Sequence, residues 1–119
     1  MKHCNDFKYD LKVGQEAENK LASILSSKTI EVKRDSWTYK SGNIAVEYES
    51  RGKPSGIRTS KADWWCFVLS GGYKDEIMVL ISASKIKELV TKYYLNGNWK
   101  EMGDNNTSKA VLIPIKEIF

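Results

Sequence analysis

Three acids lie close together between Asp35 and Glu49 and are candidates for binding a divalent metal ion. Asp35 follows an alternating segment, and Glu47 and Glu49 occupy alternate positions in a second one. Because successive side chains of a strand point to opposite faces, Glu47 and Glu49 are predicted to share a face. A hairpin would bring Asp35 close to that face. Carboxylates about 5 Å apart repel each other by roughly 3 kcal/mol per pair, unless they are solvated, partly protonated or bound to a cation.

The overall composition is that of a globular protein with a mild excess of positive charge. The 119 residues include 19 Lys and Arg and 15 Asp and Glu, which gives a net charge of +4. This length predicts a single domain over residues 1–119 with a modest core. A basic surface could hold a polyanion while the acids hold a metal at the point of reaction. The charge balance therefore favours nucleic acid as the partner.

Three features of the sequence indicate the cellular compartment of the protein, namely its N-terminus, its apolar runs and its cysteines. The N-terminus is charged and lacks the apolar segment of a secretory signal. The longest apolar run is far shorter than the roughly 20 residues of a membrane span. Cys66 lies in an apolar run and is predicted to be a buried free thiol rather than a disulfide partner of Cys4. We therefore expect a soluble cytoplasmic protein without a membrane partner.

Hydrophobic periodicity and turn residues predict the elements that would position the acids. Helices are predicted over Val13–Leu25 and Ser84–Tyr94. Strands are predicted over Thr29–Arg34, Asn43–Ser50, Trp64–Leu69, Ile77–Ser82 and Ala110–Ile115. This order predicts a mixed α/β (α+β) fold, with a mixed central β-sheet flanked by helices and an acid on the N-terminal helix.

The acids and the order of elements together resemble the PD-(D/E)XK nuclease superfamily, which includes restriction endonucleases and Holliday-junction resolvases. In that family a helix carrying an acid precedes a strand ending in Asp. A hairpin then leads to a strand with an acid, one residue and Lys. Glu18, within Gly14–Glu18, looks like the helix acid, while Asp35 and Glu47 match the strand-end Asp and the first acid of the paired motif. The resemblance covers roughly residues 13–82 and implies a restriction-endonuclease-like fold.

Glu49 departs from the family pattern because it stands where the family usually has Lys. That lysine is thought to position or activate the attacking water, although some family members carry Glu there and remain active. Glu49 could act as the general base or as a further metal ligand. A lysine from elsewhere could also fill the space, with Lys61 as the first candidate and Lys53 as the second.

The resemblance implies a Mg²⁺-dependent endonuclease, with Mn²⁺ as a substitute, that hydrolyses phosphodiester bonds in DNA. Asp35 and Glu47 would hold the metal, with Glu18 as a further ligand, because Mg²⁺ takes oxygen ligands from one or two carboxylates and from substrate phosphate. Glu49 and Lys61 would complete the catalytic set. Basic residues near the acids in sequence are the expected phosphate contacts, namely Arg34, Lys40, Arg51, Lys53, Arg58 and Lys61.

Two other functions remain open at this point. The missing lysine suggests a nuclease-like nucleic-acid-binding module without catalysis, or a subunit of a larger nucleic-acid-processing assembly. The other open function is that of a protein-interaction domain with no role in nucleic-acid binding. For a nuclease, DNA is favoured over RNA, and recognition of DNA structure is favoured over a long sequence because no separate DNA-reading domain is present. Many relatives dimerise, so a homodimer is also considered. Trp37 and Tyr39 are candidates for stacking on bases.

Overall fold

The computed structural model describes residues 3–27, 29–72 and 76–119, and the side chains of residues 10–26 within the first range. The chain divides into two compact units, Met1–Ile30 and Glu31–Phe119. The first is formed by helix α1 (His3–Ser27), which is longer than the predicted helix and contains Glu18. Among the described residues, no helix combines the length and apolar character needed to cross a membrane.

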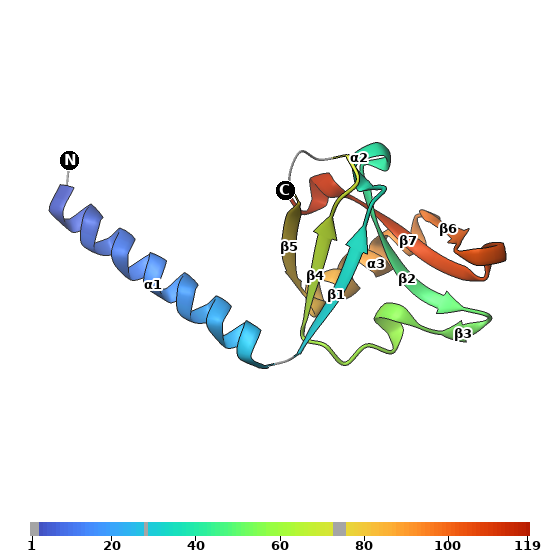
Figure 1. The fold of residues 1–119 in the computed structure, drawn as a ribbon, viewed down its shortest axis with the longest axis horizontal. Helices are drawn as coiled ribbons and strands as arrows, with labels where there is room; N and C mark the ends of the chain where they lie inside the picture. Colours follow the sequence, from blue (N-terminus) through green and yellow to red (C-terminus); the bar gives the residue numbers. More distant parts are fainter. Residues whose placement is uncertain (1–2, 28, 73–75) are drawn as a thin grey trace. The chain divides into compact units, whose positions relative to one another are not determined.

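The second unit contains two β-sheets. The first has the strand order β1-β4-β5, with β1 (Ile30–Asp35), β4 (Trp64–Leu69) and β5 (Ile77–Ser82). The second has the order β3-β2-β7-β6, with β2 (Asn43–Ser50), β3 (Lys53–Pro54), β6 (Trp99–Met102) and β7 (Ser108–Pro114). Strand β1 runs in the same direction as β4 (Figure 1), whereas β5 is antiparallel to β4. The predicted mixed α/β class with an N-terminal helix is confirmed, but its strands form two sheets.

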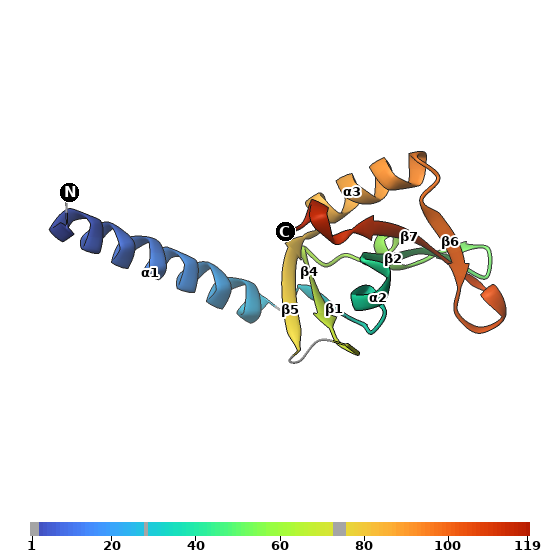
Figure 2. The same ribbon diagram turned by 90° about the horizontal axis from the view of Figure 1, so that it is seen from above.

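Short helices connect the strands, and one longer helix covers a sheet. These are α2 (Thr38–Ser41), α3 (Ala83–Leu95) and the 3-10 turns η1 (Gly56–Arg58), η2 (Asp104–Asn106) and η3 (Ile115–Glu117). Helix α3 begins after Ser82, whose hydroxyl accepts a hydrogen bond from the Lys85 N–H at 3.2 Å and so satisfies a free backbone donor. Figure 2 shows α3 on one side of the β2–β7 sheet and α2 on the other.

The core lies between α3 and the two sheets. Ile44, Val46 and Tyr48 alternate along β2, and they pack in one buried cluster with Ile86 and Leu89 of α3. Burying each of these large apolar side chains contributes about 1.5–3 kcal/mol.

Strand β4 contains Trp64, Trp65 and Cys66, which differ in burial. Trp65 is buried, whereas its neighbour Trp64 is half-buried, because successive side chains of the strand point to opposite faces. Cys66 is a half-buried free thiol, and burial raises its pKa. A less ionised thiol is a poor nucleophile, so this cysteine fits a packing role.

The predicted hairpin between β1 and β2 is wrong, because the two strands belong to different sheets. Residues 38–41 form helix α2 between them instead of a tight turn. The helix ends at Gly42, whose φ of 71° lies in the left-handed region that favours glycine. This reversal sends the chain into β2 without pairing it to β1.

Candidate functional site

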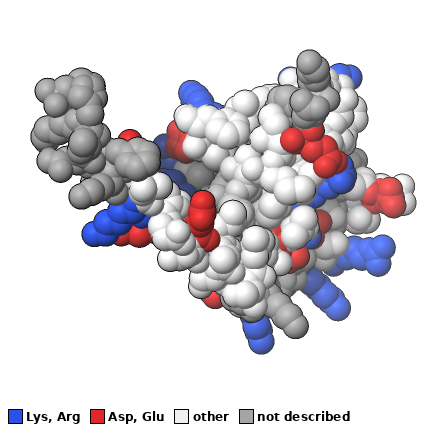
Figure 3. All heavy atoms as spheres, turned by 60° about the vertical axis from the view of Figure 1, so that its left-hand side comes forward, with Lys and Arg blue, Asp and Glu red and all other residues white. Residues whose placement is uncertain are grey.

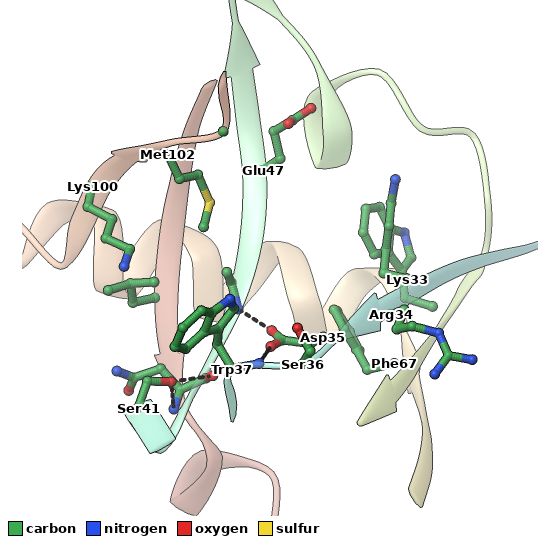
Figure 4. Close-up of a pocket in the computed structure, with 15 residues that line it drawn as sticks. Lys33, Arg34, Asp35, Ser36, Trp37, Ser41, Glu47, Phe67, Lys100 and Met102 are labelled. Atoms are coloured by element: carbon green, nitrogen blue, oxygen red, sulfur yellow. Dashed lines mark hydrogen bonds between the residues drawn. The ribbon is translucent and has the colours of Figure 1, made fainter. Parts of the chain in front are cut away.

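A cavity of about 610 Å³ lies in the second unit, where the two sheets approach each other. Its walls come from β1, the α2 segment, β2, β4, β6 and β7. Asp35 and Glu47 both line the cavity, so two of the three predicted carboxylates border the same cavity. Figure 4 shows Asp35 and Lys33 on β1, Glu47 on β2, and Lys100 with Met102 on β6.

Asp35 ends β1, as the sequence predicts, and three backbone N–H groups hold its carboxylate. Oδ1 accepts hydrogen bonds from the N–H groups of Trp37 at 2.9 Å and Thr38 at 3.0 Å. Oδ2 accepts one from Ala45 on β2 at 3.2 Å. The first two bonds fix the start of α2, and the third links β1 to β2 in place of hairpin pairing. A carboxylate has about four lone-pair positions, so Oδ2 keeps capacity for one further ligand.

Glu47 lies on the face of β2 opposite the core and is fixed by the segment before η1. The Ser55 hydroxyl donates a hydrogen bond to Glu47 Oε2 at 2.9 Å. Gly56 follows with a φ of 57°, and a Cβ at this position would collide with the Glu47 carbonyl oxygen. In Figure 4 the Glu47 carboxylate points away from Asp35. Oε1 of Glu47 accepts no hydrogen bond within the described part of the chain.

Glu49 does not share a face with Glu47, which corrects the prediction from strand alternation. Glu47 is opposite Ala110 in β7, whereas Glu49 is opposite the adjacent Lys109, because a β-bulge shifts the register between them. Adjacent residues of β7 point to opposite faces, so the bulge turns Glu49 away from the cavity. Lys109 Nζ lies 3.2 Å from Glu49 Oε2, and this hydrogen bond raises the pKa of Lys109.

Lys33 and Lys100 supply positive charge to the cavity, and neither was selected from the sequence. Lys33 lies two residues before Asp35 on β1, so strand alternation alone would have placed both on one face. Its ammonium lies 6.0 Å from the Trp65 ring centroid. Lys100 was missed because strand β6 was not predicted.

The basic residues selected from the sequence are dispersed. Arg34 lines the cavity, but its guanidinium lies 2.7 Å from Glu76 and points away from Asp35 (Figure 4). Lys40 lies on α2 beside the cavity. The other four are exposed and are absent from the cavity lining among the described residues, namely Arg51, Lys53, Arg58 and Lys61. On the face shown in Figure 3, basic and acidic side chains are interspersed.

Glu18 lies on α1, in the other compact unit, and its side chain is exposed. All the described residues that line the cavity belong to the second unit. Lys61 and Glu49, the other predicted catalytic residues, lie outside the cavity lining of the described residues.

The donor chemistry of the cavity suits a hard divalent cation. No group of three or more His, Cys, Asp or Glu side chains is arranged for metal binding within the residues whose side chains the structure describes. Mg²⁺, however, is commonly held by one or two carboxylates together with water and substrate phosphate. Asp35 Oδ2 and Glu47 Oε1 are oxygens of this kind, so the two carboxylates fit the ion in donor type.

Comparisons with known proteins found no matching family model, no matching curated protein and no matching solved structure. The resemblance to PD-(D/E)XK nucleases therefore remains a prediction from the sequence.

Proposed function

We propose that this protein is a metal-dependent endonuclease that hydrolyses phosphodiester bonds in DNA at the cavity. The observation that supports it most is that Asp35 and Glu47 line the same cavity as Lys33 and Lys100. Carboxylates next to lysines provide ligands for Mg²⁺ and charge for a phosphate at one place. A bound Mg²⁺ or Mn²⁺ would lower the pKa of a water molecule and neutralise charge on the phosphate.

Each cavity residue has a distinct part in this proposal. Asp35 Oδ2 and Glu47 Oε1 hold the metal. Lys33 takes the part of the family lysine in place of Lys61, because Lys33 lines the cavity and lies on the same strand face as Asp35. Lys100 contacts the phosphodiester from β6.

The test is a cleavage assay on plasmid, single-stranded, duplex and branched DNA and on RNA, with Mg²⁺, Mn²⁺ or a chelator. Asp35→Asn and Glu47→Gln should each slow cleavage on the order of 100-fold, because metal affinity and charge stabilisation are both lost. Asn and Gln keep an acceptor oxygen and so preserve part of the local hydrogen bonding. Lys33→Ala should reduce cleavage, whereas Lys61→Ala should leave it near the wild-type rate.

Other results would contradict parts of this proposal. Wild-type protein that cuts no substrate with either metal would refute the enzyme. Cleavage that survives Glu47→Gln would show that the site lies elsewhere.

A second candidate function is a nucleic-acid-binding module without catalysis. It is favoured by the hydrogen bonds that occupy most of the Asp35 carboxylate and by the ion pair that holds Glu49 away from Glu47. This module would bind DNA with an affinity that falls as salt rises, and would cut nothing when metal is added. Detectable cleavage that is abolished by Asp35→Asn would reject it.

In this proposal the protein acts on DNA in the cytoplasm and has no membrane partner. A single active site cuts one strand at a time, so we also propose that a homodimer or a larger assembly acts on duplex DNA. Sedimentation of the full chain with and without DNA measures this directly, and a monomer under both conditions would contradict it.

A further inference from the structure

One aromatic side chain at the cavity has no part in the proposed metal chemistry. Trp37 lines the cavity, yet its side chain is 66% exposed. Its backbone is fixed by the hydrogen bond to Asp35, so the indole is attached to a rigid point of the fold. Leaving a large aromatic surface in water is unfavourable, which makes an exposed indole at a cavity a candidate ligand contact.

A lysine adds positive charge to this aromatic surface. Lys40 Nζ lies 5.2 Å from the Trp37 ring centroid and 5.8 Å from that of Tyr39. Tyr39 is itself 41% exposed. Aromatic rings beside basic residues are the usual surface for single-stranded nucleic acid, because bases stack on the rings and phosphates contact the cations. We refer to Trp37, Tyr39 and Lys40 as the α2 platform.

The cavity next to the α2 platform has the size and walls suited to a nucleotide. Its volume of about 610 Å³ lies within the range of roughly 300–1,000 Å³ that is typical of small-molecule pockets. The half-buried Met102 and Leu112 form an apolar wall, while Lys33 and Lys100 provide charge. A base paired within a duplex cannot present its flat face to such a wall, whereas an unpaired base can.

We propose that the cavity accepts an unpaired nucleotide whose base stacks on Trp37. Lys33, Lys40 and Lys100 contact the neighbouring phosphates. The substrate class is then single-stranded DNA, or branched DNA with an unpaired segment. This inference rests on the proposed function in that it assigns nucleic acid to the same cavity, and it identifies which form of DNA is bound.

The test measures binding of the full chain to fluorescent oligonucleotides in chelator, so that cleavage cannot interfere. Three probes of equal length are compared: oligothymidine, the same backbone with abasic positions, and a hairpin duplex. Wild-type protein should bind oligothymidine at least about tenfold more tightly than either of the others. Trp37→Ala should weaken binding of oligothymidine about 5- to 150-fold, from the 1–3 kcal/mol typical of one stacked base. Trp37→Phe should restore part of the affinity.

Trp99→Ala is the matched control. Trp99 is 40% exposed, and Lys109 lies 5.4 Å from its ring centroid, so it pairs an exposed indole with a lysine as Trp37 does. It is not part of the cavity lining among the described residues. Its removal should leave oligothymidine binding unchanged. Circular dichroism of both alanine variants checks that they remain folded.

The outcomes separate this inference from the proposed nuclease activity. Equal wild-type affinity for oligothymidine and the abasic probe, or equal losses in Trp37→Ala and Trp99→Ala, would overturn the stacking site. Lack of binding to every probe at low salt would overturn it as well. Base-dependent binding through Trp37 without cleavage in Mg²⁺ or Mn²⁺ would support the inference and refute the enzyme.

Discussion

Asp35 combines a structural task with a proposed catalytic one. Its carboxylate accepts N–H groups from Trp37, Thr38 and Ala45, and these bonds join the start of α2 to β2. Because the same carboxylate is a proposed metal ligand, loss of activity in Asp35→Ala would mix two causes. Measuring stability separates them.

Asp35→Ala should lower the free energy of unfolding by about 2–3 kcal/mol, because three backbone donors lose their acceptor. Urea unfolding followed by tryptophan fluorescence measures the change. Asp63→Ala is the control, since the Asp63 side chain is exposed and accepts no hydrogen bond from the described residues. Equal stability of the two variants would show that the Asp35 hydrogen bonds contribute little.

The sequence predicted some of the candidate residues because their placement depends on local pattern. Asp35 lies at a strand end, and Glu47 lies opposite the core face of β2, as alternation requires. The side on which Glu49 lies depends instead on pairing with Lys109 in β7, far along the chain. No pattern within β2 contains that information, so the bulge and the ion pair could not be predicted.

At the scale of elements, close packing of η1 against β2 fixes Glu47. Gly56 permits this approach because any side chain there would meet the Glu47 backbone. The same packing positions Ser55 to donate its hydrogen bond to Glu47. Glycine is required here both for its positive φ and for its lack of a Cβ.

Gly56→Ala should therefore destabilise the fold by more than Gly52→Ala. Both glycines have positive φ, 57° and 78°, so both substitutions carry the cost of about 1–2 kcal/mol for a left-handed residue. Only Gly56 is also in close contact with a neighbour, since Gly52 has open space around it. Thermal or urea unfolding of the two variants measures the difference. A smaller loss in Gly56→Ala than in Gly52→Ala would contradict the packing argument.

Two elements illustrate what local sequence cannot specify. The residues from Trp37 to Lys40 are aromatic, β-branched and basic, a composition typical of strands. Thr38–Ser41 nevertheless form α2, and the N–H groups of Trp37 and Thr38 at its start donate hydrogen bonds to Asp35 Oδ1. Each face of strand β6 carries one apolar and one charged residue, so its sequence shows no alternating hydrophobic pattern. The strand forms by pairing with β7. In both cases a tertiary or capping interaction overrides the local preference.

At the scale of the whole molecule, the class of fold was predictable and the division into two sheets was not. Helical and strand periodicity indicate a mixed α/β protein, whereas the strand order depends on which distant strands pair. The C-terminal segment is an example of such a distant contact. The Tyr93 hydroxyl on α3 donates a hydrogen bond to Glu117 Oε1 at 2.8 Å, and Lys92 Nζ lies 3.5 Å from Oε2.

This contact predicts a pH dependence of stability. The Tyr93 hydrogen bond, and then the charge of Lys92, lower the pKa of Glu117 below its usual value near 4.5. A carboxylate with a lowered pKa stabilises the fold above its unfolded pKa and loses that effect as pH falls through its folded pKa. The stability difference between wild type and Glu117→Gln should therefore be present at pH 7 and shrink below about pH 4.5.

Titration of the Glu117 carboxyl by NMR measures its pKa directly. Tyr93→Phe removes the largest cause of the shift, so the midpoint should rise towards the ordinary value in that variant. An unchanged midpoint would show that Tyr93 does not determine it.

The β-bulge in β2 makes the side on which Glu49 lies a property of the length of β7. One extra residue inserted between Lys109 and Ala110 would give Tyr48 a partner and remove the bulge. Glu49 would then turn to the cavity face beside Glu47, with no change in either glutamate. A single-codon insertion in a distant strand would therefore place Glu49 beside Glu47, so that the paired-acid motif is gained or lost through a change outside the motif itself.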